Sequence, residues 1–335
     1  PLPVQYADYT LWQREVLGSE EDPDSPLSRQ LVYWRQALDG MPDELAVPTD
    51  RLRPARPSGA GGTINFEIPA RLHADVVALA RAHGVSPFMV MQAAVTLLLC
   101  RLGAGTDVPI GIPVAGRTDV ALEDVVGLFV NTLVLRTDLS GNPTFAELLA
   151  RVRETDLAAY AHQDVPFERL VEALNPARVP GRHPLFQVRL VFNNIDQGEA
   201  AEAVADLPGI SAEAAPVTLD AAKFDLLFRF LERHREDGTP AGMAASLEYS
   251  ADLFDPESVT TLGRRLVRVL SGVVADPGVR LGQVAVLSPV ERERLTVEWN
   301  GTDRPLDFRS LPELFAARVA VSPGAVAVSS GGVDL

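Results

Sequence analysis

The sequence predicts an α/β protein in which a mixed sheet is packed by helices. Strand-like runs and helical segments follow one another along the whole chain, which is the order expected of this class. Hydrophobic residues make up 47% of the 335 residues and charged residues 22%, so a full core can be buried. No internal repeat is visible, which excludes a solenoid.

Helices are predicted wherever apolar residues recur every three or four positions. Ser86-Pro87 also marks a helix start, because serine caps free N–H groups and proline fits the first turn. The helix that begins there is almost entirely apolar, and we expect it to be buried. The predicted helices are 6–17, 27–38, 69–82, 86–102, 143–160, 166–174, 256–274, 289–297 and 311–319.

Strands are predicted where apolar residues alternate with polar ones or form short continuous runs. Ile64 and Phe66 alternate with Asn65 and Glu67, which indicates a strand with one buried face. Residues 195–216 are acidic and alanine-rich without a period, and we expect a functional or mobile excursion there. The predicted strands are 63–68, 107–114, 129–135, 186–192, 217–219, 225–231 and 244–249, with the start of another at 325–328.

Charge and cysteine content exclude several classes of protein. The net charge of −15 argues against nucleic-acid binding, and no apolar run has the length of a membrane span. Cys100 is the only cysteine, so an intrachain disulfide is impossible and a cytoplasmic location is expected. Arg51, Arg53 and Arg56 lie among prolines, and we interpret them as a solvated loop. The five histidines are scattered in the sequence, and no zinc motif or phosphate loop is present.

Four segments stand out as motifs. They are Tyr6-Ala7-Asp8-Tyr9-Thr10-Leu11-Trp12, Val126-Gly127-Leu128-Phe129-Val130-Asn131-Thr132, His162-Gln163-Asp164-Val165-Pro166-Phe167-Glu168 and Arg182-His183-Pro184-Leu185-Phe186-Gln187-Val188. In order and spacing they resemble the motifs of condensation domains of nonribosomal peptide synthetases. The resemblance covers about residues 1–285 and implies a chloramphenicol-acetyltransferase-like lobe, the C-terminal lobe of such a domain.

Beyond that lobe the sequence resembles the start of an adenylation domain, at Leu287-Ser288-Pro289 and Trp299-Asn300. We therefore expect a condensation lobe at 1–280, an interdomain linker at 281–310 and a truncated adenylation start at 311–335. Both ends look cut from a longer polypeptide.

The resemblance implies amide bond formation between a carrier-bound acyl or peptidyl thioester and a carrier-bound aminoacyl thioester, in secondary-metabolite synthesis. The family's His-His-x-x-x-Asp-Gly motif is not in this sequence. The resemblance therefore implies that the catalytic histidine belongs to a preceding lobe, that no residue of this chain is catalytic, and that the chain alone is inactive. The implied partners are upstream and downstream carrier proteins, the preceding lobe and the adenylation domain, with no nucleic acid or membrane. No cofactor is expected to bind directly, and the phosphopantetheine arms of the carriers act as substrates.

The resemblance also implies a substrate tunnel lined by Asn194, Gly127, Asn131 and Thr132. A carboxamide at Asn194 could hold a thioester carbonyl or an amine, because it both donates and accepts hydrogen bonds. The alternative is that Asn194 only ends a strand and starts a turn. Glycine at 127 would let the backbone approach a neighbour closely.

Other motif residues are expected to be structural. Arg117 resembles the family's arginine that pairs with an aspartate of the absent motif across the lobe interface, and the alternative is an exposed turn residue. We expect Asp164 to cap the next helix and His162 to lie at a helix C-terminus, while Tyr9 and Trp12 anchor the core. The predicted structural set is Arg117, Tyr6, Asp8, Trp12, His162, Gln163, Asp164, Pro166, Phe167 and Glu168.

Two further functions remain open from the sequence. One is a related epimerisation or cyclisation enzyme, against which the Phe129-Val130-Asn131-Thr132 run argues. The other is a noncatalytic condensation-like platform that docks carrier or tailoring proteins.

Overall fold

The computed structural model describes residues 2–117, 119–193, 220–303 and 309–335. Its contacts divide the chain into one unit at Pro1–Val286 and a second at Leu287–Leu335, and each is described by itself. The hydrophobic core lies entirely in the first unit. The domain boundaries expected at 280 and 310 stay predictions.

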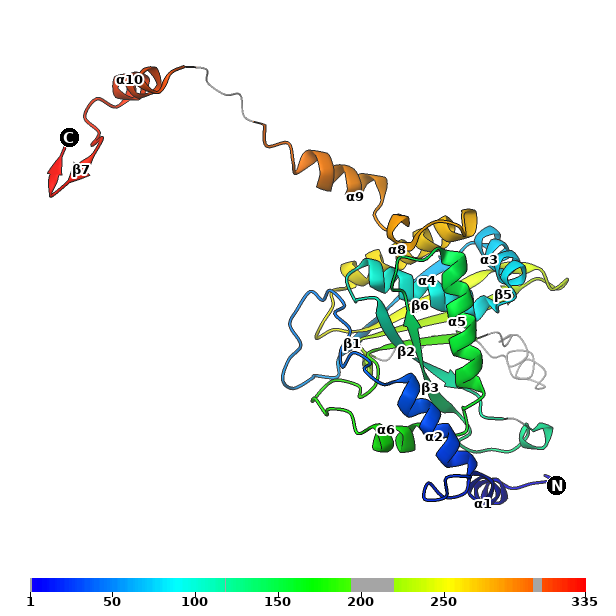
Figure 1. The fold of residues 1–335 in the computed structure, drawn as a ribbon. Helices are drawn as coiled ribbons and strands as arrows, with labels where there is room; N and C mark the ends of the chain where they lie inside the picture. The colour runs from blue at the N-terminus through cyan, green and yellow to red at the C-terminus, as the bar shows by residue number, and fades with distance from the viewer. Residues whose placement is uncertain (1, 118, 194–219, 304–308) are drawn as a thin grey trace, which may run out of the picture. The chain divides into compact units, whose positions relative to one another are not determined.

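The first unit is built on a six-stranded mixed sheet (Figure 1). The strand order is β1-β6-β5-β4-β2-β3, with β4 parallel to both β5 and β2 and the remaining pairs antiparallel. The mixed sheet predicted from the sequence is therefore confirmed. Its strands are β1 (Gly61–Ile68), β2 (Asp107–Val114), β3 (Asn131–Asp138), β4 (Val188–Asn193), β5 (Leu226–His234) and β6 (Pro240–Ser250).

Four helices pack against the sheet and against one another. The central one is α4, in which every residue from Met89 to Leu99 is buried, as its apolar sequence predicted. Ser86 caps it by accepting a hydrogen bond from the Met89 amide at 3.2 Å. The layer consists of α3 (Ala70–His83), α4 (Pro87–Arg101), α5 (Phe145–Tyr160) and α8 (Pro256–Ala275).

Three more helices lie near the β3 edge of the sheet (Figure 1). α1 (Tyr6–Leu17) contacts α2 (Pro26–Ala37), which in turn contacts α6 (Phe167–Leu174). Trp34 of α2 is almost fully buried, and its indole N–H donates to the His162 carbonyl at 2.8 Å. This contact ties α2 to the segment that precedes α6.

The sheet face away from the helix layer carries polar residues on strands β1, β5 and β6, next to the apolar side chains of Leu227 and Leu231. Along β1, Thr63, Asn65 and Glu67 are exposed, while Ile64 and Phe66 turn toward α8. Arg229 of β5 and Glu248 of β6 occupy the same polar face as the exposed β1 residues.

The second unit contains α9 (Pro289–Glu293), a π-helical turn at Arg294–Glu298, and α10 (Leu311–Val321). Neither helix contains a buried residue. The strand expected at 325–328 is wrong: the chain instead forms a short hairpin of β7 (Ser329–Ser330) and β8 (Val333–Asp334). The weak strand expected at 217–219 lies outside the described residues.

Among the described residues, no single helix is both long and apolar enough to cross a membrane. The pair α3 and α4 reaches that length and apolarity only when joined across a 103° bend, and α4 is the core helix of the first unit.

Candidate functional site

Three of the four sequence motifs meet at one groove with a cavity volume of about 360 Å³. One wall comes from α1, a second from the segment before β3, and a third from the segment that leads into α6. Residues far apart in the sequence are thus brought together. The groove, called the motif groove below, is lined by Tyr9, Trp12, Gln13, Val16, Leu17, Pro26, Gly116, Leu128–Thr132, Gln163, Asp164 and Pro166–Glu168.

An aromatic cluster joins α1 to the 120–130 loop. The rings of Tyr6 and Tyr9 pack on Phe129, with centroids 5.3 and 4.8 Å away. The Tyr6 hydroxyl donates to the Leu128 carbonyl at 2.9 Å. A Cβ on Gly127 would lie 2.1 Å from the Tyr6 ring, which explains the glycine. Trp12 was expected in the core, but 52% of it is exposed, because it lies at the open groove.

Asn131 connects β3 to the segment before α6. Its amide nitrogen donates to the carbonyls of Gln163 and Val165 at 2.9 and 2.8 Å. Its oxygen accepts from the amides of Thr132 and Phe167 at 2.8 and 3.0 Å. All the hydrogen-bonding capacity of the carboxamide is used within the fold, so Asn131 is a structural clamp. Thr132, also predicted to line a tunnel, lines the motif groove.

The third motif is held by α2. Asp164 accepts from the Gln30 side chain at 2.8 Å, and the Asp164 amide donates back to Gln30 at 3.1 Å. The predicted cap by Asp164 is therefore wrong: the first helical amide, that of Phe167, is bound by Asn131 instead. His162 does follow a helix C-terminus as expected, with Nδ1 2.7 Å from the Ala158 carbonyl and its ring stacked on Tyr33. Gln30 had no signal in the sequence.

Arg117 fixes the shape of the 120–130 loop. Its guanidinium donates to the carbonyls of Leu122 and Val125 and lies 4.1 Å from the Phe129 ring centroid. These contacts lie within its own loop, whereas the sequence predicted a pair with an aspartate of another lobe. Asn194, the expected tunnel residue, lies outside the described residues.

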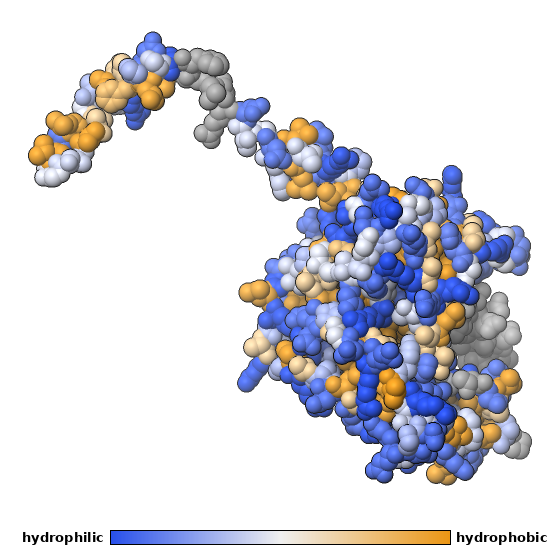
Figure 2. Space-filling view, in the orientation of Figure 1, coloured by the Kyte–Doolittle hydropathy of each residue, from blue (hydrophilic) through white to orange (hydrophobic). Residues whose placement is uncertain are grey.

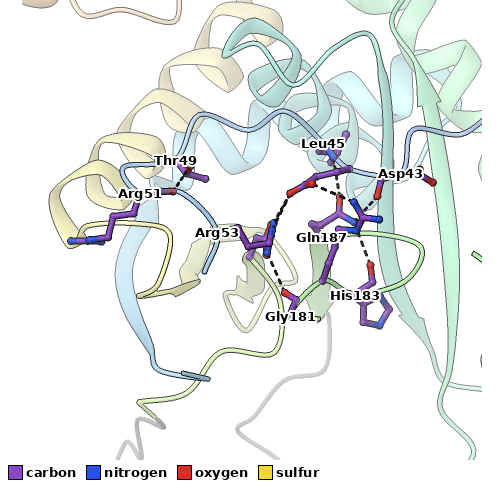
Figure 3. A network of polar contacts seen from close by, with 11 residues as sticks. Asp43, Leu45, Thr49, Arg51, Arg53, Gly181, His183 and Gln187 are labelled. Atoms are coloured by element: carbon purple, nitrogen blue, oxygen red, sulfur yellow. Dashed lines mark hydrogen bonds and ion pairs between the residues drawn. The ribbon is translucent and has the colours of Figure 1, made fainter. Parts of the chain in front are cut away.

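The fourth motif joins the 43–56 loop to β4 (Figure 3). Gln187 accepts from the Leu45 amide at 3.0 Å, and Arg53 binds Asp225 at 2.9 and 2.5 Å. Arg53 also donates to the Gly181 carbonyl at 3.2 Å. The interpretation of this basic region as a solvated loop is therefore wrong for Arg53, which anchors the loop to the start of β5.

Two histidines that are distant in the sequence meet outside the motif groove. Ligand atoms of His73, Glu232 and His234 lie within 4.8 Å of one another. The Gly242 amide donates to His73 Nδ1 at 3.3 Å, so the neutral ring carries its proton on Nε2, 3.0 Å from the Glu232 carboxylate. Because a metal would need that nitrogen without its proton, this arrangement fits a hydrogen-bonded carboxylate better than a metal centre.

The chain is similar to segments of large synthetases. It is 49% identical over 328 residues to the dimodular nonribosomal peptide synthase of Bacillus subtilis (strain 168), covering 98% of this chain and 14% of that protein. It is 42% identical over 340 residues to the isonitrile lipopeptide synthase of Mycobacterium tuberculosis (strain ATCC 25618 / H37Rv), covering 100% of this chain and 13% of that protein. The chain thus spans about a seventh of these curated relatives.

Solved structures extend the comparison to the fold. A complex of the X-domain and OxyB from teicoplanin biosynthesis contains a chain of 38% identity, with a TM-score of 0.79 over 86% of this chain and 62% of that one. The X-domain alone matches at 39% identity with the same TM-score, over 86% of this chain and 63% of that one.

These findings correct the function predicted from the sequence. That prediction was amide bond formation by a domain whose catalytic histidine belongs to a preceding lobe. The first unit contains a histidine cluster of its own, at His73 and His234. Its fold also matches an X-domain that was solved bound to another protein. The docking alternative is therefore better supported than the catalytic one.

The family itself follows from a direct match. The condensation-domain family model covers residues 1–296, which is most of the chain. Together with the similarity to synthetase segments, this match establishes that the chain belongs to the condensation-domain family of nonribosomal peptide synthetases.

Proposed function

We propose that this chain is a noncatalytic condensation-like platform that docks a tailoring protein at the motif groove. The observation that carries the proposal is the likeness to the X-domain in complex with OxyB, at 38% identity and over 86% of this chain. A sequence identity of 38% indicates a relationship closer than a shared fold alone.

The rim of the motif groove supports protein docking. Exposed apolar residues of α1 and of the loop before β3 lie along this rim, which is a feature of protein-docking surfaces. Figure 2 shows apolar residues among hydrophilic ones in the lower part of the view, where Figure 1 places α1 and α2. The exposed side chains are Leu11, Trp12 and Val16 of α1 and Val126, Leu128 and Val130 of the loop.

The rim is also held in one shape before any partner arrives. Arg117 binds two carbonyls of the loop, and Tyr6 binds a third. A preformed surface loses less conformational entropy on binding, so more of the contact energy remains as affinity. Trp12 at the groove wall is the residue type most often found at the energetic centre of interfaces.

The charge of the groove indicates the chemistry of the partner. Asp164 and Glu168 line it, and neither forms a salt bridge within the described ranges. A partner surface with apolar residues flanked by lysine or arginine complements this groove. We therefore propose a basic, apolar patch on the tailoring protein as the occupant.

The test is a binding measurement by surface plasmon resonance with OxyB as the probe. The chain should bind OxyB, and Trp12→Ala together with Leu128→Ser should weaken binding about tenfold or more. Leu52→Ser is the matched control, because Leu52 is 94% exposed but does not line the motif groove. This control should leave the affinity unchanged.

Two results would count against the proposal. One is the absence of a complex at protein concentrations where the X-domain binds OxyB. The other is equal weakening by the groove variants and by Leu52→Ser. If the chain binds a carrier protein but not OxyB, the proposed tailoring partner is wrong and the partner is a carrier protein.

The finer sequence predictions are kept as proposals. Residues 311–335 remain the proposed start of an adenylation domain, supported by the resemblance of Leu287-Ser288-Pro289, Trp299-Asn300, Leu314-Phe315 and residues 323–328. Carrier proteins with phosphopantetheine arms, and a cytoplasmic location, are proposed on the resemblance alone.

A further inference from the structure

A second cavity, of about 290 Å³, lies at the end of β4, apart from the motif groove. One part of its wall is apolar: Ile112 and Leu190 are buried, and the rings of Phe88 and Phe192 meet edge to face at 6.2 Å. One carboxylate, that of Glu232, takes part in the lining. The full lining is Ser86, Pro87, Phe88, Ile112, Pro113, Tyr160, Leu190, Phe192 and Glu232.

A chain of hydrogen bonds positions Glu232. The Gly242 amide donates to Nδ1 of the fully buried His73, which leaves the ring proton on Nε2. That nitrogen lies 3.0 Å from Glu232 Oε1. The Glu232 side chain is only 9% exposed, and its second oxygen has no hydrogen-bond partner in the described part of the chain. The carboxylate is therefore fixed at one oxygen and available at the other.

Within the described ranges, neither an arginine nor a lysine pairs with this carboxylate, and its ion-pair partner is the His73 ring. Arg233 turns to Glu67 at 3.2 Å, and Arg235 binds Thr239 at 3.1 Å. His73 is neutral when it accepts from Gly242, and His234 is exposed with its ring edge to face against His73. A nearly buried carboxylate without a cation is costly unless a ligand supplies the charge.

We propose that this cavity binds a small organic ammonium ion that carries an apolar body. The ammonium donates to the free oxygen of Glu232, and the rings of Phe88 and Phe192 add cation–π attraction. The apolar body lies against Ile112 and Leu190. The site differs from the chemistry that the family resemblance implied, which needs a neutral amine to attack a thioester.

The probe pair is phenethylamine, which is a cation at pH 7.5, and 2-phenylethanol, which is neutral and has the same body. Binding to the full chain is measured by NMR with labelled isoleucine and leucine methyl groups. Phenethylamine should produce saturable changes in the chemical shifts of the Ile112 and Leu190 methyl groups. The affinity for 2-phenylethanol should be lower by a factor of about ten or more.

Glu232→Gln keeps the shape of the side chain and removes its charge. This variant should lose the preference for phenethylamine while its weak binding of 2-phenylethanol stays unchanged. Glu236→Gln is the control, because Glu236 is an exposed glutamate that does not line the cavity. It should retain the preference of the unmodified chain.

The proposal is overturned if phenethylamine and 2-phenylethanol bind the unmodified chain equally. It is also overturned if neither compound shifts the Ile112 and Leu190 methyl signals at about 10 mM, which is on the order of the dissociation constant of a very weak site. It is also overturned if folded Glu232→Gln retains the preference. The first two results are measured on the unmodified chain, so the proposal can still be rejected if Glu232→Gln does not fold.

Discussion

At the scale of single residues, the most consequential group is the buried carboxyl of Asp156 on α5. It accepts a hydrogen bond from Gln92 of α4 at 3.1 Å, but its other oxygen is buried without a partner. Burial raises the pKa of Asp156 to about 7, despite the opposing hydrogen bond from Gln92. The folded state therefore favours the neutral acid, whereas the unfolded chain ionises near 3.8.

Stability should fall as the pH rises through this range. Between pH 4 and 7 the folded state holds a proton that the unfolded chain has lost, so the stabilisation is present at low pH and lost as pH passes 7. Asp156→Asn removes the ionisable group and should raise the free energy of unfolding at pH 8.5 by on the order of 1–3 kcal/mol, with a smaller gain at pH 6. Urea unfolding at the two pH values measures this difference.

Asp138→Asn serves as the control for this prediction. Asp138 is exposed, and its pKa is lowered by hydrogen bonds from Ser140 and by Arg151 despite some burial. Its substitution should give no gain at pH 8.5. Equal pH dependence in Asp156→Asn and the unmodified chain would show that Asp156 is not the titrating group.

At the scale of elements, the start of β3 and the start of α6 depend on one side chain. Asn131 makes four hydrogen bonds that join these two elements and also form a wall of the motif groove. The sequence indicated that Asn131 matters but assigned it to a tunnel. Only the fold shows that its partners are backbone groups of residues 163–167.

Asn131→Ala should lower the free energy of unfolding by about 2–3 kcal/mol, because partly buried backbone groups lose their partners. Hydrogen exchange should become faster at Phe167, whose amide Asn131 binds, before the sheet is affected. The control is Asn65→Ala on the exposed face of β1, with an expected change within about 0.5 kcal/mol. Equal effects of the two substitutions would reject the clamp.

At the scale of the whole molecule, stability resides in the first unit. The core cluster ends at Val286, and α9 and α10 contribute no buried residue. Helix α8, by contrast, buries Val259, Leu266 and Val269. The two units should therefore differ sharply in what their removal costs.

Truncation after Val286 should leave the main unfolding transition in place, with a similar Tm by scanning calorimetry. Truncation after Ala251, which removes α8, should abolish that transition, because several fully buried apolar side chains are lost together. A chain ending at Val286 that no longer unfolds cooperatively would contradict this assignment of the core.

The sequence by itself determined the α/β class, nearly every helix and strand, and the family, because periodicity, caps and short motifs are local properties. The capped helix α4 and the strand β2 were predicted almost residue by residue. The tertiary structure alone decided which residues meet: Asp164 with Gln30, Arg117 with its own loop, and His73 with Glu232. It also decided that Trp12 is exposed. Such contacts join residues far apart in the sequence, 159 positions for His73 and Glu232, and depend on packing that no local pattern encodes.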